Sequence, residues 1–116
     1  MNIQDLTHQI IDFCRERDWD QFHTTKDMAV GLVTESAELL DLFRFKDEAE
    51  AQAMLKDLSK REKIEDELAD VLFWVLRFAQ KNEIDLESSF AAKMKKNIAK
   101  YPADQVRGSN RKYTEY

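Results

Sequence analysis

The sequence predicts an all-α protein built mainly of four helices. Only two glycines and one proline occur among 116 residues, so few positions disfavour a helix. Charged residues make up 35% of the chain and hydrophobic residues 43%, a balance typical of a globular helical domain rather than of a disordered chain. Apolar residues recur three and four positions apart in several segments, which is the period of an amphipathic helix.

The first helix is expected at residues 3–17, with Asn2 as its N-cap. Its apolar stripe carries Cys14, the single cysteine of the chain, so a buried and unreactive thiol is expected there. Residues 17–23 have no helical period. They place Trp19 and His23 on a connecting segment, where aromatic side chains either seal a core or stack on a ligand.

A second helix is expected at residues 26–45 and is apolar around nearly its whole circumference. A small domain cannot cover such a helix on every side, so part of its surface is expected in an interface between subunits. Gly31 would let a neighbouring backbone or a ligand approach this helix closely, with ordinary small-residue packing as the simpler explanation.

Residues 46–58 are rich in alanine and charge and predict a connector with a weak helix of its own. The four residues that follow, Ser-Lys-Arg-Glu at 59–62, match a capping box, which is expected to open a third helix ending near Lys81.

Asp85 is expected to cap a fourth helix that ends near Tyr101, just before the only proline. Residues 103–116 have no period. They are expected to form an arm or a disordered tail beside a domain of residues 1–102.

Two acidic pairs carry the strongest functional signal, Glu35-Ser-Ala-Glu38 and Glu67-Leu-Ala-Asp70. A spacing of three residues puts both acids of a pair on one helix face. Glu35 lies on an apolar face, where an unpaired carboxylate is costly. Four carboxylates are hard oxygen ligands that suit Mg²⁺, or Mn²⁺ as a substitute. They predict a metal site able to hold a polyphosphate between the second and third helices.

Two alternatives compete with this hypothesis. A ferritin-type di-metal bundle uses Glu-x-x-His motifs, whereas the Asp-x-x-His sequences of this chain, at 5–8 and 20–23, use aspartate. A non-catalytic helical interaction module would leave the acids solvated or paired with Lys63 and Arg77. Two matching acidic pairs on two strongly apolar helices favour the metal site.

The net charge of −5 argues against nucleic acid as the main partner. No segment has the apolar length of a membrane span, and the N-terminal residues lack the basic and apolar regions of a signal peptide. A cytoplasmic protein without membrane contact is therefore expected.

These motifs together resemble the MazG-like superfamily of all-α nucleoside triphosphate pyrophosphohydrolases, whose motif is E-x-x-E, a spacer and E-x-x-D. The resemblance also covers residues 17–23, 65–71 and 93–102, in the order and spacing of the dCTP pyrophosphatase branch. It extends over about residues 10–102, nearly the whole predicted domain.

The resemblance implies a four-helix MazG-like bundle, a homodimer or homotetramer, that converts a nucleoside triphosphate to the monophosphate and pyrophosphate. The residues that would bind Mg²⁺ and carry catalysis are Glu35, Glu38, Glu67 and Asp70. Those that would bind the nucleoside, phosphate or sugar are Trp19, His23, Lys93, Asn97 and Tyr101.

Two positions depart from the family pattern. Ile10 stands where the vertebrate dCTP enzymes have a histidine, so the resemblance does not extend to strict cytosine selectivity. Trp74 stands where a tyrosine is common.

Overall fold

The computed structural model describes residues 1–110 and 112–115, and in that part of the chain every regular element is a helix. This confirms the all-α prediction. Contacts within the chain define two units, Met1–Glu83 and Ile84–Tyr116, and each is described by itself. Among the described residues, no helix combines the length and apolar character needed to cross a membrane.

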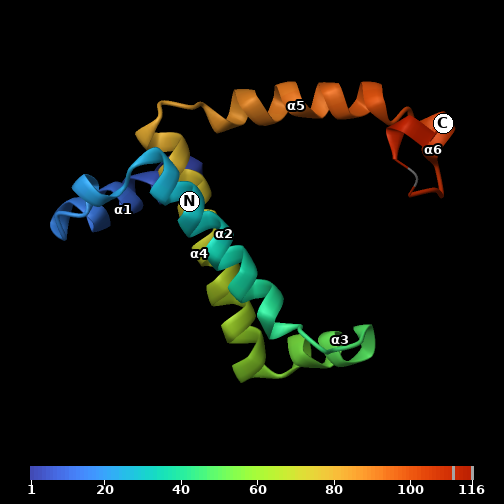
Figure 1. The fold of residues 1–116 in the computed structure, drawn as a ribbon, viewed down its shortest axis with the longest axis horizontal. Coiled ribbons are helices and arrows are strands. Elements are labelled where there is room, and N and C mark those ends of the chain that lie inside the picture. Colours follow the sequence, from blue (N-terminus) through green and yellow to red (C-terminus); the bar gives the residue numbers. More distant parts are fainter. Residues whose placement is uncertain (111, 116) are drawn as a thin grey trace. The chain divides into compact units, whose positions relative to one another are not determined.

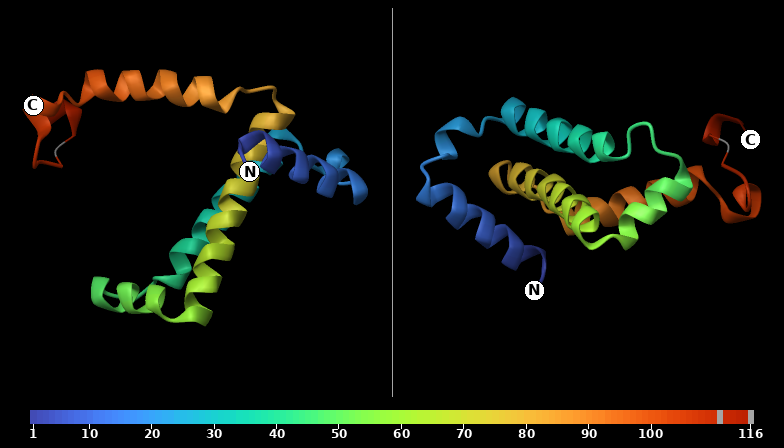
Figure 2. Two further views of the ribbon diagram at one scale, coloured as in Figure 1. Left: turned by 180° about the vertical axis from the view of Figure 1, so that it is seen from behind. Right: turned by 90° about the horizontal axis from the view of Figure 1, so that it is seen from below.

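The first unit contains four α-helices and one short 3-10 helix. Helix α2 runs along α4, and α1 and α3 also pack against α4 (Figures 1 and 2). The elements are α1 (Ile3–Glu16), η1 (Asp20–Phe22), α2 (Thr25–Leu42), α3 (Glu48–Lys56) and α4 (Leu58–Lys81). The buried apolar core consists of Ile10, Cys14, Met28, Ile64, Leu76 and Ala79. The long helix α4 therefore organises this unit.

Side-chain caps explain where most of these helices begin. Asn2 caps α1 as predicted, in a reciprocal capping box with Asp5. The Thr24 hydroxyl accepts from a backbone N–H of α2, and Asp47 opens α3 through a second capping box. The weak helix expected in the connector is thus present as α3.

The predicted start of the third long helix is wrong by a few residues. Helix α4 begins at Leu58, because the Asp57 carboxylate accepts from the backbone N–H groups of Ser59 and Lys60. Ser59 is itself inside the helix, and its hydroxyl donates to Asp57. An ionised aspartate two positions earlier competes successfully for these N–H groups. Helix α2 also ends earlier than predicted, at Leu42.

Helix α1 ends in a Schellman motif that positions Trp19. Asp18 adopts a left-handed conformation, with φ of 54°, and the Trp19 N–H donates to the Cys14 carbonyl at 3.0 Å. The hydrophobic contact that accompanies this motif is made by the Trp19 and Phe13 rings, whose centroids are 5.5 Å apart. The aperiodic segment is thus a defined turn that folds Trp19 back onto α1.

The second unit contains helix α5 (Leu86–Lys100), the short α6 (Ala103–Val106) and a 3-10 turn, η2 (Tyr113–Glu115). Asp85 caps α5 as predicted, and Tyr101 is its C-cap residue. The last two elements are short helical turns in a segment whose sequence has no period. The proposed domain boundary at residue 102 stays a prediction.

Candidate functional site

Three of the four predicted metal ligands meet between α2 and α4. Glu35 and Glu38 come from α2 and Glu67 comes from α4, and one carboxylate oxygen of each lies within 4.8 Å of the other two. One oxygen of Glu35 and one of Glu67 are buried and have no hydrogen-bond partner. Buried carboxylate oxygens without a partner are costly, so the group fits a cation held by hard oxygen ligands.

The electrostatics of the cluster point the same way. Burial and, after it, the neighbouring Glu38 carboxylate are the main causes that raise the pKa of Glu35 from 4.5 to about 7. Burial and Glu38 also raise the pKa of Glu67. Like charges that share a desolvated site resist ionisation unless a cation neutralises them.

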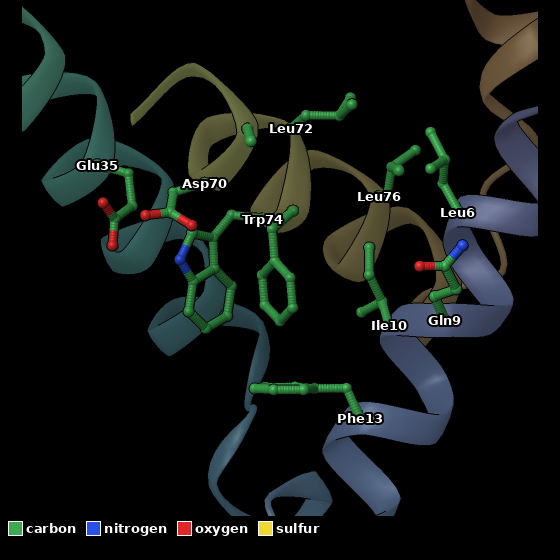
Figure 3. A pocket seen from close by; sticks show the side chains of 11 residues that line it. Leu6, Gln9, Ile10, Phe13, Glu35, Asp70, Leu72, Trp74 and Leu76 are labelled. Atoms are coloured by element: carbon green, nitrogen blue, oxygen red, sulfur yellow. The ribbon is translucent and has the colours of Figure 1, made fainter. Parts of the chain in front are cut away.

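Asp70 lies beside this group rather than in it. Its carboxylate is not among the three that approach within 4.8 Å, but its charge raises the pKa of both Glu35 and Glu67. Figure 3 shows the Asp70 and Glu35 side chains next to one another at one end of a pocket. Asp70 therefore stays a predicted ligand, placed where it could complete the set.

A pocket of about 550 Å³ opens beside the carboxylates, between α1, α2 and α4 (Figure 3). Its size is within the range of sites for small organic ligands. Its acidic end is formed by Glu35 and Asp70. The apolar walls include Leu6, Ile10, Phe13, Leu72, Phe73 and Trp74. The arrangement suits a molecule with one flat apolar part and one part that binds through metal.

Gly31 allows the indole ring of Trp74, which lines the pocket, to lie against α2. A Cβ atom at Gly31 would come within 2.5 Å of Trp74 Cε2, so no larger residue fits without displacing the indole. The close approach that the sequence suggested is thus made by a side chain of α4. The Trp74 indole then packs edge-to-face with Phe73, at 5.1 Å between centroids.

Trp19 and His23 stand directly behind the pocket wall. Trp19 contacts Phe13, and the His23 ring lies 5.1 Å from that of Trp74, while Phe13 and Trp74 themselves line the pocket. The two predicted nucleoside-binding residues therefore support the aromatic wall and are not among its lining residues. Their direct contact with a nucleoside stays a prediction.

Arg77 holds this aromatic region together. Its buried guanidinium forms an ion pair with Asp20, and its Nε–H donates to His23 Nδ1 at 3.0 Å. This ion pair lowers the pKa of Asp20, while burial, followed by the Arg77 charge, lowers the pKa of His23. The interaction-module hypothesis paired Arg77 with the acidic cluster, and the structure gives it a different partner.

The ferritin-type and interaction-module hypotheses find little support among the described residues. His23 accepts a hydrogen bond from Arg77. The candidate metal ligands Glu35, Glu38 and Glu67 are all carboxylates, so this group is not the Glu-x-x-His ligand set of a ferritin-type site. In the same part of the chain, the ion pairs do not include Lys63. Cys14 is fully buried and its pKa is raised by burial, as expected for an unreactive thiol.

The remaining predicted residues lie in the second unit. Lys93 and Asn97 are one turn apart on α5, and Tyr101 follows one turn later as the C-cap. Asn97 is half-buried, and Lys93 is exposed. Their contact with phosphate or sugar stays a prediction.

The model of the MazG-like family matches residues 32–116, which include both acidic pairs and all of α4 and α5. The chain belongs to the MazG-like family. The resemblance seen in the motifs is thereby confirmed.

Curated relatives agree with this assignment. The MazG-like chain is 35% identical to human dCTP pyrophosphatase 1 and 34% identical to the rat protein of the same name, in each case over 113 residues. These alignments cover 97% of this chain and 66% of each relative. The chain thus spans just under two thirds of the length of these relatives.

A solved structure supports the fold. The crystal structure of a pyrophosphatase from Archaeoglobus fulgidus superimposes with a TM-score of 0.79 and is 33% identical in sequence. The match covers 85% of the MazG-like chain and 91% of the archaeal chain.

Proposed function

We propose that this MazG-like chain is a nucleoside triphosphate pyrophosphohydrolase that converts a nucleotide, most simply a deoxynucleotide, to its monophosphate and pyrophosphate. The observation that carries the proposal is the pair of buried, unpartnered oxygens of Glu35 and Glu67, beside an apolar pocket large enough for a nucleoside. The names of the relatives, dCTP pyrophosphatase 1 and a pyrophosphatase, support it.

Glu35, Glu38, Glu67 and Asp70 are the residues that would hold a divalent cation, Mg²⁺ in this proposal. When bound, such a cation would neutralise the charge of the phosphate chain and polarise a phosphoryl oxygen. The aromatic wall around Phe13 and Trp74 would hold the base and exclude water on that side. The substrate is thereby oriented with its phosphates toward the carboxylates.

One assay tests the proposal. Purified protein is incubated with a panel of nucleoside triphosphates in the presence of Mg²⁺, and in parallel with a chelator, and the products are identified. We expect the monophosphate and pyrophosphate with Mg²⁺ and no turnover with the chelator. Orthophosphate as the product would place the attack at another phosphorus and contradict the proposal. An inactive protein that binds no metal would favour the interaction module, and an inactive protein that retains iron would favour the di-metal alternative. A cytoplasmic location stays a prediction.

A further inference from the structure

The pocket has a second polar end, opposite its carboxylates. Figure 3 shows Glu35 and Asp70 at one end and Gln9, from α1, at the other, with Trp74 and Ile10 between them. Among the described residues that line the pocket, Gln9 alone combines a hydrogen-bond donor and an acceptor on a neutral side chain. A ligand that lies along the pocket with its phosphates at the acids therefore directs its opposite end toward this amide.

Little holds the Gln9 amide in one orientation. In the part of the chain that the structure describes, its Nε2 donates to Met1 Sδ at 3.1 Å, and a thioether is a weak acceptor. Gln9 itself is exposed. An amide can turn over about its terminal bond and exchange the positions of its NH₂ group and its oxygen. Gln9 can thus present donor and acceptor in either order.

Nucleobases present these groups in two opposite orders. Cytosine and adenine carry an amino donor next to an acceptor ring nitrogen, whereas uracil, thymine and hypoxanthine carry an oxo acceptor next to a ring N–H. A fixed donor or acceptor would match one class and leave the other with an unpaired group. A freely turning amide matches both.

We infer that Gln9 reads the edge of the nucleobase and that the pocket accepts bases with either an amino or an oxo group at that edge. This inference rests on the proposed pyrophosphohydrolase function. The apolar Ile10 beside Gln9 adds no further donor or acceptor, so the Gln9 amide is the group at this end that pairs with either order. Gln9 accordingly binds the base edge and permits both classes of base, and catalysis is left to the carboxylates.

The test uses dCTP and dUTP, which differ only in the group at C4 and in the protonation of N3. For the wild-type protein we expect kcat/KM values for the two nucleotides within about tenfold of one another. Gln9→Glu replaces the amide with a group that only accepts. It pairs with the amino group of dCTP or the N3–H of dUTP but leaves the neighbouring acceptor of either base unpaired, so kcat/KM should fall by about tenfold or more for both nucleotides. Gln9→Leu removes both groups and should raise KM for both nucleotides by a similar factor.

The added charge of Gln9→Glu is controlled in two ways. Gln9→Leu removes the donor and the acceptor without adding a charge, so a similar loss in that variant cannot come from repulsion of the triphosphate. Gln4→Glu places the same charge elsewhere on the exposed surface of α1 and should leave kcat/KM unchanged for both nucleotides. A wild-type enzyme that is active but discriminates more than about 100-fold between dCTP and dUTP, or a Gln9→Leu variant with wild-type KM for both nucleotides, overturns the inference alone. Failure of the wild type to hydrolyse any nucleotide overturns the proposed function as well.

Discussion

Glu35 links the folding of the chain to the proposed metal site. A carboxyl group that must be neutral or neutralised inside the folded protein, but is free to ionise when unfolded, makes stability depend on pH. The reference value for Glu35 is 4.5 and the folded value is about 7, so between these values the folded chain binds more protons than the unfolded chain. Protonation of Glu35 therefore stabilises the folded protein fully below about pH 4.5, and this stabilisation is lost as the pH rises to about 7.

We predict that chelator-treated protein becomes less stable as the pH rises through this window, and that Mg²⁺ restores the loss. Denaturant unfolding at several pH values, with and without Mg²⁺, measures both effects; a cation at about 100 times its Kd adds about 2.7 kcal/mol. If the stability of the metal-free protein rises steadily from about pH 5 to about pH 7 and Mg²⁺ has no effect, the acids are structural.

Glu38→Gln should separate charge repulsion from metal binding. Glu38 raises the pKa of both Glu35 and Glu67, so the variant should flatten the loss of stability with pH in the metal-free protein. It also removes one charged ligand, and turnover and stabilisation by Mg²⁺ should both be lost. Glu62→Gln, at an exposed position on the same helix as Glu67, is the matched control. It should leave turnover, the pH dependence of stability and the stabilisation by Mg²⁺ unchanged. A Glu38→Gln variant that unfolds would contradict the proposed role.

The sequence could identify the acids but not all of their neighbours. The spacing of Glu35 and Glu38 on an apolar helix is a local feature, and it predicts a desolvated pair directly. Arg77 and Asp20 are 57 residues apart, and nothing local indicates that they pair. Gln9 was missed for the same reason, because its position at the pocket depends on how α1 lies against α4.

At the scale of elements, the contact between α2 and α4 depends on one glycine. We predict that Gly31→Ala destabilises the protein by about 1–3 kcal/mol through overpacking against Trp74, despite a gain of about 1 kcal/mol in helix propensity. The displaced indole should also raise KM, because Trp74 lines the pocket. Thermal unfolding and steady-state kinetics measure the two effects.

A double-mutant cycle isolates the steric cause of this effect. In a Trp74→Leu background the ring that the new methyl group meets is gone, so Gly31→Ala should become neutral or stabilising. Equal destabilisation in both backgrounds would show that the clash with Trp74 is not responsible.

Helix ends show what limits prediction for the elements. Asn2 and Asp85 were identified as caps because each directly precedes a periodic apolar segment. At the start of α4 two residues within three positions could serve as the N-cap. Asp57, the stronger hydrogen-bond acceptor, is the N-cap in the structure, and Ser59 lies inside the helix. At α2 the apolar pattern continues through Phe45, but that residue adopts φ of 63° and lies outside the helix. The hydrophobic period alone therefore does not predict the residue at which a helix ends.

At the scale of the whole molecule, helix α2 carries apolar side chains on two opposite faces. Met28 is buried and Gly31 contacts Trp74 on the face toward α4. On the opposite face the side chains of Val30, Val33 and Leu40 are 52%, 68% and 70% exposed, at the spacing of one continuous stripe. An exposed apolar stripe of this kind is typical of a surface that is covered in an oligomer.

We therefore expect the protein to form a homodimer or homotetramer, and Val33→Asp to dissociate it, because burying an unpaired carboxylate in an apolar interface is costly. Size-exclusion chromatography with light scattering compares the mass in solution with the 13.7 kDa of one chain. Ala53→Asp, which adds the same charge to an exposed position of α3, should leave the assembly intact. A wild-type protein that is monomeric at micromolar concentration would contradict this interpretation of the stripe, and an intact Val33→Asp oligomer would place the interface elsewhere.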